Sequence, residues 1–566
     1  MRHRLQLPEA MGAGLVAAAA LACPAAARQP PTLDYTLSPE LKDGALIALD
    51  VSLRLTADSS GVTRLDLPDR EAGTSDLWRY LDDVQVDGAQ SVSTPAPAVR
   101  IVRSRPAAPL TVRYRVVSAF PQDPDGVNFD PYKPAVRPQW FWAYGEALFV
   151  RPDDDRRKAR FRWAGPKGFP FASDLEHPAG RPMSLDQLRE SVAVGGPELS
   201  IYRRDAQGPL RIAVIGAFPF SGGAFADTAT RIVRAERAFW RAKEGPFLVA
   251  LAPLATTPNH QSTQGEGRGD AFSIMTTANV RESTLKVTLA HEYFHTWNPD
   301  RLGGMHPGDA ERADYWFSEG FTDFFGRRLL LRSGEFDAKA FAGDWNEALL
   351  AYAGSPARSA PGAQIVEGFW KDRSVEKLPY QRGAILAAVW DQRLRERSHG
   401  RVGLDYVVRA MRERAQRLGP RAPKAPQLFV ETALRFGLDP RPEIAAVIDR
   451  GGPALLPANA FPGFEVRTLT VPAFDIGFDY DATRAAPDQA VRGVRPDSAA
   501  YAAGLRDGMT YLRRQAGKFG DSRETYTIRV RDQGAERSIS FKPEGKATLT
   551  LQELSPRPAS GAKTDG

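Results

Sequence analysis

Apolar and polar residues alternate along the first third of the chain. Residues 46–55 and 110–117 show this period of two clearly, and it is typical of strands with one buried face. Proline and glycine interrupt the runs at short intervals, which indicates short strands joined by turns. We predict an antiparallel β domain over residues 28–199.

An aromatic cluster lies near the end of this region and consists of Trp140, Phe141, Trp142, Tyr144 and Phe149. We interpret it as part of the hydrophobic core. The alternative is that these rings line a cleft.

Residues 200–333 mix strand and helix patterns. Residues 210–218 and 247–254 are apolar runs of strand length, whereas residues 226–243 have the period of an amphipathic helix. A polar, glycine-rich stretch at 264–270 precedes a second apolar run, which predicts an edge strand. One helix is expected around residues 289–298. A second should begin near Asp314, with Asp314 and Ser318 as candidate N-caps.

Helical periodicity continues over residues 334–455, with helices expected at 341–353, 382–397, 404–417 and 428–436. Short strand patterns return over residues 456–555. Residues 556–566 form a polar tail that we expect to be disordered. The whole pattern predicts an α+β multidomain protein.

Composition and charge exclude some classes of partner. Of the 566 residues, 42% are hydrophobic and 25% are charged, which is ordinary for a globular chain. The formal net charge of +7 is modest, and acidic and basic residues are interleaved. Because there is no basic stripe with stacking aromatics, we expect no nucleic-acid partner.

The first 27 residues have the pattern of a cleaved signal peptide. Arg2 and Arg4 precede an apolar stretch that is too short to span a bilayer, and an Ala-x-Ala cleavage site ends at Ala27. We therefore expect no transmembrane segment and a periplasmic or secreted protein. The only cysteine, Cys23, lies within this leader. A lipoprotein anchored at Cys23 is the alternative, although its lipobox is poor.

The motif H-E-x-x-H occurs once, at residues 291–295. On a helix, His291 and His295 lie one turn apart on the same face and can bind one metal ion. Two histidines and one carboxylate, here Glu319, form a typical catalytic zinc site with a place left for water. Glu292 is then the general base. Asp323, one helical turn after Glu319, can accept the free ring N–H of a ligand histidine.

The sequences H-E-Y-F-H-T-W-N at 291–298 and W-F-S-E-G-F-T-D-F-F at 316–325 resemble the glycyl aminopeptidase family of gluzincin metallopeptidases. The resemblance covers residues 33–555. It implies a thermolysin-like catalytic domain at 200–333, a helical domain at 334–455 and a PDZ-like domain at 456–555. It also implies one zinc ion per chain, held by His291, His295 and Glu319, with Glu292 as the base.

Two further features follow from the resemblance. The family has a tyrosine in a Y-x-K-G-type helix start that donates a hydrogen bond to the oxyanion, and Tyr380-Gln381-Arg382-Gly383 matches it with arginine for lysine. In the C-terminal domain, residues 474–478 match the loop with which a PDZ domain captures a peptide carboxylate, and residues 498–505 match its short helix. A peptide C-terminus is therefore a possible partner of this domain by β-augmentation.

The chain departs from the family at the site for the substrate's amino group. Family members have a Gly-Gly-Leu-Glu-His-like stretch whose glutamate binds this ammonium, whereas this chain has Gly265-Glu266-Gly267-Arg268-Gly269-Asp270. Glu266, Gly269 and Asp270 are the candidate substrate-binding residues.

The predicted function is that of an exported zinc metallopeptidase that acts on peptides as an aminopeptidase. The altered loop leaves two alternatives open. One is an endopeptidase of the same fold, and the other is a non-catalytic, chaperone-like protein that binds peptides.

Overall fold

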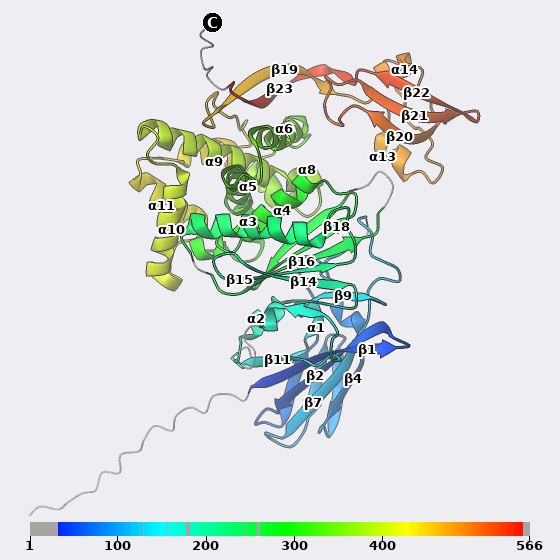
Figure 1. Ribbon diagram of the computed structural model, residues 1–566, viewed down its shortest axis with the longest axis vertical. Helices are drawn as coiled ribbons and strands as arrows, with labels where there is room; N and C mark the ends of the chain where they lie inside the picture. Colours follow the sequence, from blue (N-terminus) through cyan, green and yellow to red (C-terminus); the bar gives the residue numbers. More distant parts are fainter. Residues whose placement is uncertain are drawn as a thin grey trace, which may run out of the picture.

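A computed structural model describes residues 32–558, apart from 128, 154–155, 177–180, 243 and 257–260. The predicted signal peptide, Cys23 and residues 559–566 of the predicted tail lie outside the described residues. The architecture is mixed α+β with several sheets and helical layers, as the sequence predicts (Figure 1).

The N-terminal β domain contains three sheets, ordered β11-β1-β2-β7-β4, β10-β3-β6-β5 and β12-β13-β9-β8. Its strands are β1 (Leu33–Lys42), β2 (Ala45–Thr56), β3 (Val62–Asp66), β4 (Leu81–Asp87), β5 (Ser91–Ala96), β6 (Val99–Arg103), β7 (Pro109–Val116), β8 (Ala135–Arg137), β9 (Trp140–Tyr144), β10 (Arg151–Pro152), β11 (Ala159–Trp163), β12 (Phe171–Ser173) and β13 (Val192–Gly195). Its short helices are η1 (Leu77–Tyr80), α1 (Gly145–Leu148), η2 (Asp174–Glu176) and α2 (Leu185–Arg189).

The prediction of purely antiparallel pairing is wrong at one place. Strands β1 and β11 pair in parallel, with Leu33 opposite Ala159. Parallel partners need a long connection, and here the connection is most of the domain, so local patterning could not reveal the pair.

The aromatic cluster is core, as predicted, since each of its five side chains is at most 5% exposed. Phe141 and Phe149 pack within the β domain, while Trp140, Trp142 and Tyr144 pack against the sheet of the next domain. The Tyr144 hydroxyl lies 2.7 Å from Ser273 Oγ in that sheet. Strand β9 therefore joins the two domains.

The catalytic region is built on a five-stranded sheet of order β14-β15-β16-β18-β17. Strands β15, β16 and β18 are parallel, whereas β14 and β17 are antiparallel edge strands, so the predicted edge strand is present as β17. The elements are β14 (Leu199–Asp205), β15 (Pro209–Ile215), α3 (Gly222–Trp240), β16 (Phe247–Leu254), β17 (Thr263–Arg268), β18 (Ala271–Thr277), α4 (Glu282–Phe294), η3 (Asp300–Leu302), η4 (Gly308–Ala313) and α5 (Tyr315–Ser333).

The helical region follows the predicted periodicity closely. Its helices are α6 (Ala338–Gly354), α7 (Gly362–Gly368), α8 (Arg373–Glu376), α9 (Leu378–Arg397), α10 (Leu404–Leu418), η5 (Gly419–Arg421), α11 (Ala425–Arg435), α12 (Arg441–Glu443) and η6 (Ile444–Asp449). Helix α9 begins four residues before the predicted residue 382, so Tyr380 lies in its first turn.

The C-terminal region consists of a long two-stranded arm and a separate small unit (Figure 1). The arm is β19 (Phe464–Phe474) paired with β23 (Glu544–Pro556), and it docks on α6, where the Asn346 side chain hydrogen-bonds both the N–H and the C=O of Leu554. The unit contains α13 (Tyr480–Ala485), α14 (Ala499–Ala502), β20 (Thr510–Ala516), β21 (Tyr526–Asp532) and β22 (Ala535–Phe541), and has its own hydrophobic core.

The loop expected to capture a peptide carboxylate already has internal partners. The Gly477 N–H donates to the Asp475 carboxylate, and Arg495 N–H donates to the Gly477 carbonyl. Helix α13, rather than a strand, follows the loop. Capture of a peptide C-terminus by this unit stays a prediction.

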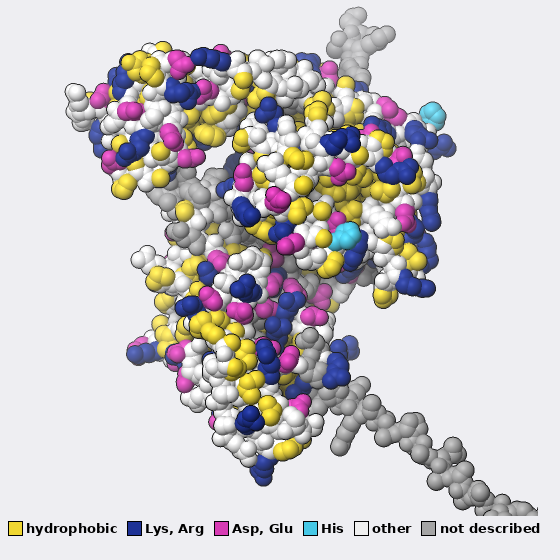
Figure 2. All heavy atoms as spheres, turned by 180° about the vertical axis from the view of Figure 1, so that it is seen from behind, with side chains coloured by type: hydrophobic (Ala, Val, Ile, Leu, Met, Phe, Trp, Pro, Cys, Tyr) yellow, Lys and Arg dark blue, Asp and Glu magenta, His cyan; other side chains and the backbone are white. Residues whose placement is uncertain are grey.

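Charges of both signs are mixed on the described surface. On the face shown in Figure 2, acidic and basic side chains are both spread over the surface and are interspersed with apolar ones. Within the described part of the chain, no helix has the length and apolar character needed to span a membrane.

Helix α5 packs closely against both α9 and α4. A Cβ atom at Gly383 of α9 would lie 1.9 Å from the carbonyl oxygen of Trp316, and one at Gly320 of α5 would lie 2.4 Å from Gly383 Cα. On the other side of α5, a Cβ at Gly326 would lie 3.4 Å from the His291 nitrogen of α4. Glycine therefore lets α5 and α9 approach at backbone distance, whereas a Cβ at Gly326 would make ordinary van der Waals contact with α4.

We predict that Gly383→Ala destabilises the protein by about 1–3 kcal/mol, the range typical of an overpacked core, because α9 must move away from α5. Urea unfolding would measure the change. Gly343→Ala is the matched control, since Gly343 is an exposed residue of α6 with no atom within 4 Å of a Cβ there. That control should be neutral or stabilising by up to about 1 kcal/mol, and an equal loss in both variants would contradict the role of the contact.

Candidate metal centre and active site

Helix α4 presents the two histidines of the motif to the same point. The regular helix ends at Phe294, but His295 keeps helical backbone angles (φ −62°, ψ −15°). His295 therefore stays one turn beyond His291, as the spacing predicts. The two Nε2 atoms lie 3.1 Å apart.

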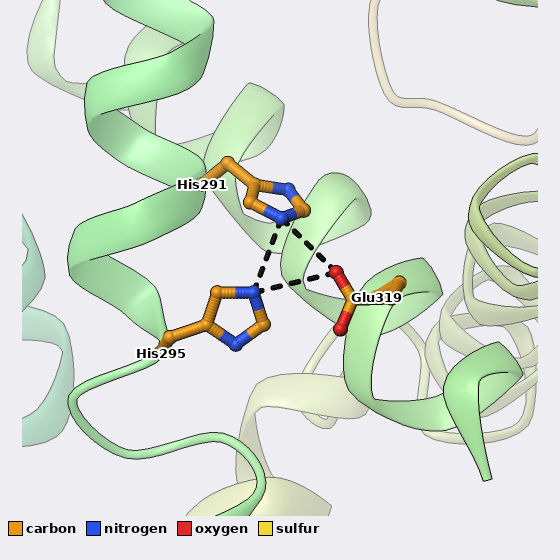
Figure 3. A group of neighbouring side chains, drawn as sticks. All are labelled: His291, His295 and Glu319. Carbon is orange, nitrogen blue, oxygen red and sulfur yellow. Dashed lines mark hydrogen bonds and ion pairs between the residues drawn. The ribbon is translucent and has the colours of Figure 1, made fainter. Parts of the chain in front are cut away.

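Helix α5 brings a carboxylate to these two nitrogens (Figure 3). Glu319 Oε2 lies 3.2 Å from His291 Nε2 and 3.4 Å from His295 Nε2. The buried Ser318 hydroxyl donates to Glu319 Oε1 at 2.9 Å, which leaves Oε2 to face the imidazoles. The two histidines come from α4 and its C-cap and the carboxylate from α5, and together they form the one group of metal-ligand type found among the described residues.

The outer nitrogen of each imidazole is already hydrogen-bonded. His291 Nδ1 lies 2.8 Å from Asp323 Oδ1, as the sequence predicts, and His295 Nδ1 lies 2.8 Å from the carbonyl oxygen of Asn298. These acceptors assign the ring proton to Nδ1 in both residues and leave each Nε2 lone pair free to bind a metal. The sequence analysis missed the Asn298 carbonyl because a backbone acceptor has no residue-type signature.

Asp323 also forms an ion pair with Arg327. Arg327 bridges Asp323 Oδ2, at 2.8 Å, and Asp344 Oδ2, at 2.5 Å. Burial alone would raise the pKa of Asp323, but Arg327 and the hydrogen bond with His291 lower it to about 2. Asp323 is therefore an ionised acceptor that fixes the orientation of His291.

The donor set fits a tetrahedral metal ion. Zinc–nitrogen and zinc–oxygen bonds of about 2.0–2.1 Å place tetrahedral ligand atoms about 3.3 Å apart. The observed separations of 3.1, 3.2 and 3.4 Å agree with this spacing. Two neutral imidazoles and one carboxylate suit a divalent ion of borderline softness.

Glu292 lies between the donor set and the edge strand β17. A Cβ atom at Gly265 would lie 2.9 Å from Glu292 Cγ and 3.0 Å from Oε1, and one at Gly267 would lie 3.9 Å from His295 Cβ. The lack of a side chain at Gly265 lets the edge strand run directly against α4, whereas a Cβ at Gly267 would make only ordinary van der Waals contact. Burial raises the pKa of Glu292, while His291 and His295 oppose the rise, so its carboxylate is suited to accept a proton.

Glu266 projects from the opposite face of the same strand, because side chains alternate along a strand. Its side chain is 31% exposed, and Tyr132 of the β domain hydrogen-bonds it. Burial and the neighbouring Glu292 raise the pKa of Glu266 to about 7, against the opposing effect of Arg268. Glu266 is thus an acidic group close to the general-base candidate.

Arg268, on the same face as Glu266, is held by acids from the β domain. It is 3% exposed, with Nη1 2.7 Å from Glu71 and Nε 3.4 Å from Glu190. Glu266 lies 3.8 Å away. These pairs tie the edge strand to the N-terminal domain.

Two other predicted substrate-binding residues lie in the turn after β17. Gly269 has φ +54°, and a Cβ there would lie 2.8 Å from the Asp174 carboxylate and 3.2 Å from the Glu190 carbonyl. Asp270 closes the same turn, and its backbone hydrogen-bonds Asp174. The structure places both residues against the β domain.

Tyr380 covers the donor set from helix α9. Its ring lies 5.9 Å from that of His291 with an interplanar angle of 22°. Burial and the carboxylates of Glu319 and Glu292 raise the pKa of Tyr380 well above its usual value. The phenol therefore stays protonated and able to donate.

The N-cap expectation for α5 holds in position only. Asp314 occupies the N-cap, but its carboxylate accepts from the backbone and ring nitrogens of His306, both at 2.8 Å, instead of capping the helix. Ser318 lies inside α5.

The donor set lies in a part of the chain that matches a known protein family. Residues 284–366 match the family model described as M61 glycyl aminopeptidase. A crystal structure of an aminopeptidase N family protein from Idiomarina loihiensis has a similar fold, with a TM-score of 0.65 and 17% sequence identity over 93% of this chain and 98% of the other. A comparison with curated protein sequences gives no match. These findings confirm the resemblance inferred from the two motifs.

We predict that Asp323→Asn weakens binding of a divalent metal by about 10- to 100-fold, the usual effect of losing an outer hydrogen-bond partner of a ligand histidine. Chelator competition would measure the affinity. Asp309→Asn, on an exposed carboxylate of η4, should leave it unchanged. An unchanged metal affinity in the Asp323 variant would show that Asp323 does not support the metal centre.

Proposed function

Because the chain is related to the glycyl aminopeptidase family of metallopeptidases, we propose that it is a zinc-dependent aminopeptidase. The observation that carries the proposal is the combination of the His291–His295–Glu319 donor set with Glu266 on the adjacent edge strand. The donor set supports peptide hydrolysis, and Glu266 supports recognition of a free N-terminus.

The residues of this chain have distinct roles in the proposed reaction. His291, His295 and Glu319 hold one zinc ion, which supplies Lewis acidity for the attack of water on the peptide carbonyl. Glu292 removes a proton from the attacking water and passes it to the leaving amine. Tyr380 donates a hydrogen bond to the oxyanion, an interaction worth about 2.7–4 kcal/mol at comparable sites.

Substrate recognition combines the edge strand and one side chain. An extended peptide can add to the free edge of β17 through backbone hydrogen bonds, and this places its first residue near Glu266. The ionised Glu266 carboxylate then pairs with the α-ammonium group. Of the three candidate residues, Glu266 is the one we retain as the anchor, since Gly269 and Asp270 lie in the turn that packs on Asp174.

The proposal also covers the roles of the domains and the cellular location of the protein. A thermolysin-like catalytic domain at 200–333 and a helical domain at 334–455 enclose the site, and the PDZ-like unit within 456–555 packs beside them. The leader at residues 1–27 supports an exported enzyme in the periplasm or outside the cell.

Two alternatives predict different measurements. An endopeptidase would cut free and N-acetylated peptides at equal rates. A non-catalytic peptide-binding protein would bind peptides without turnover. The acidic Glu266, which interacts electrostatically with Glu292, favours the aminopeptidase.

We predict that Glu292→Gln lowers kcat by about 10²–10⁴-fold, the contribution typical of a general base, while the protein keeps one zinc per chain. Metal analysis and peptide turnover would be measured on the same preparation. Glu282→Gln, on an exposed carboxylate in the first turn of α4, is the control and should stay active. Absence of zinc together with unchanged turnover in the Glu292 variant would refute the proposal.

We predict that Glu266→Gln lowers kcat/KM for peptides with a free N-terminus by about 10- to 100-fold, as expected for a lost hydrogen bond to a charged group of about 1.5–3 kcal/mol. N-acetylated peptides should be poor substrates of both proteins. Asp270→Asn, the other acid at this end of the strand, should behave like the unmodified chain.

The same pair of proteins should differ in pH dependence. With a raised pKa of about 7, Glu266 is neutral at lower pH and cannot pair with an ammonium group. The kcat/KM of the unmodified chain should therefore rise as pH increases through 7, and Glu266→Gln should lose this rise. Equal profiles would argue against the anchor and for the endopeptidase.

A further inference from the structure

Tyr132 of the β domain lies against the edge strand β17, beside the proposed amine anchor. It belongs to the segment between β7 and β8 and is half-buried. Its ring meets the ring of Tyr144 edge to face at 5.8 Å, and the Arg268 guanidinium lies 5.8 Å from its ring centroid. Its hydroxyl donates a hydrogen bond to the Glu266 carboxylate. A phenol of one domain therefore contacts the candidate anchor of the next.

The turn that carries Tyr132 is fixed by the carboxylate of Asp130. The Thr74 hydroxyl lies 2.9 Å from Asp130 Oδ1 and 2.8 Å from Oδ2, and the Tyr132 N–H donates to Oδ1 at 3.1 Å. The Lys133 ammonium group lies 3.3 Å from Oδ2. Phe129, just before this turn, is buried in the core shared by the β domain and the catalytic sheet. These contacts give the phenol a defined position at the strand.

The backbone of Glu266 is held by a second tyrosine of the β domain. Ser273 Oγ donates to the Glu266 carbonyl oxygen at 3.2 Å, and the Tyr144 hydroxyl lies 2.7 Å from Ser273 Oγ. Because Ser273 has a single hydroxyl proton and uses it on this carbonyl, Tyr144 is the donor to Ser273. These contacts leave the Glu266 side chain free to rotate, and the Tyr132 hydroxyl restricts that rotation.

Other ionisable groups near Glu266 do not replace this contact. The charges that act on the Glu266 carboxylate come from Glu292 of α4, Arg268 of its own strand and Glu71 of the β domain. Arg268 lies 3.8 Å from Glu266 but 2.7 Å from Glu71, which is its closer partner. The phenols of Tyr144 and Tyr315, whose pKa values burial raises, stay protonated.

We propose that Tyr132 is a positioning residue for substrate recognition, whose hydroxyl orients the Glu266 carboxylate toward the α-ammonium group of the substrate. A carboxylate has acceptor sites on both oxygens, so one bond from Tyr132 leaves capacity for the ammonium group. A hydrogen bond to the charged form also favours the ionised carboxylate, which is the form that pairs with a cation. This inference rests on the proposed function, in which Glu266 is the anchor.

Peptide binding to the full chain that carries Glu292→Gln tests this role without turnover. This parent protein, saturated with zinc, would be titrated calorimetrically with trialanine and with N-acetyl-trialanine. Adding Tyr132→Phe keeps the ring and removes only the hydroxyl. The affinity for trialanine near pH 7 should fall by about 3- to 10-fold, because a smaller fraction of Glu266 is then ionised. The weak affinity for the acetylated peptide should not change.

The pH dependence separates this role from a purely structural one. Between about pH 6 and pH 7.5, below the usual pKa of a peptide amino group of about 7.7–8.0, the affinity for trialanine should increase as Glu266 loses its proton. Loss of the Tyr132 hydrogen bond raises the pKa of Glu266, so this increase should move to higher pH in Tyr132→Phe. A loosened turn would instead lower the affinity equally at every pH.

Two further variants of the parent protein complete the comparison. Tyr406→Phe removes a hydroxyl from an exposed tyrosine of α10 and should bind both peptides like the parent. Glu266→Gln should bind trialanine weakly and without the pH-dependent increase. Adding Tyr132→Phe to Glu266→Gln should cause no further loss, because groups that act as one unit are not additive.

Two results would overturn the role of Tyr132 while leaving Glu266 as the anchor. One is a Tyr132→Phe protein with the affinity and pH dependence of the parent, although Glu266→Gln loses both. The other is an equal loss from Tyr132→Phe with and without the Glu266 carboxylate. If Glu266→Gln itself binds trialanine like the parent, the anchor of the proposed function fails, and the role of Tyr132 fails with it.

Discussion

The metal centre depends on the close packing of α5 against its two neighbouring helices. Gly320 and Gly383 let the backbones of α5 and α9 touch, and Gly326 of α5 lies against the backbone of α4 beside His291. Metal-ligand atoms tolerate errors of only a few tenths of an ångström, and a contact between backbones cannot relax by changing rotamers. Aromatic packing fixes the helices further, for example between Phe294 and Phe325, whose rings lie 5.3 Å apart.

The side chains of the edge strand β17 alternate between two faces, and each face makes a different set of contacts. Its glycines, Gly265 and Gly267, face α4, and a Cβ at Gly265 would lie only 2.9 Å from Glu292 Cγ. Its charged residues, Glu266 and Arg268, face the β domain. One strand therefore lies against Glu292, the proposed general base, on one face and carries Glu266, the proposed partner of the substrate's amino group, on the other, because the two sets of side chains never share a face.

The sequence predicted those parts of the site that depend on local spacing. The separation of His291 and His295, the return of Glu319 on a second helix and the place of Asp323 one turn later are properties of helices and could be read directly. For the same reason, local spacing was enough to predict the helices and the edge strand β17. The Asn298 carbonyl and the β1–β11 pair depend on contacts between distant segments or on backbone atoms, which leave no pattern in the sequence.

The choice between the two acidic residues of the glycine-rich stretch illustrates the same limit of reading a site from sequence. Glu266 and Asp270 are equivalent as acidic residues in a glycine-rich stretch, and a motif comparison could not choose between them. The strand ends at Arg268, so Glu266 lies within the ladder and Asp270 in the turn. Glu266 is preferred because the hydrogen-bonded pairing of β17 ends at Arg268, and the point where this pairing ends is set by the tertiary structure.

The contacts of Arg268 bear on how separable the domains are. Its counter-charges Glu71 and Glu190 both come from the N-terminal β domain, and Tyr144 of that domain reaches Ser273 in the catalytic sheet. Without the β domain, a buried guanidinium on the substrate-binding strand would lose the groups that neutralise it. The border near residue 199 therefore separates two stretches of chain but not two independent units, and an insertion, truncation or domain exchange at that border would alter the wall of the active site itself.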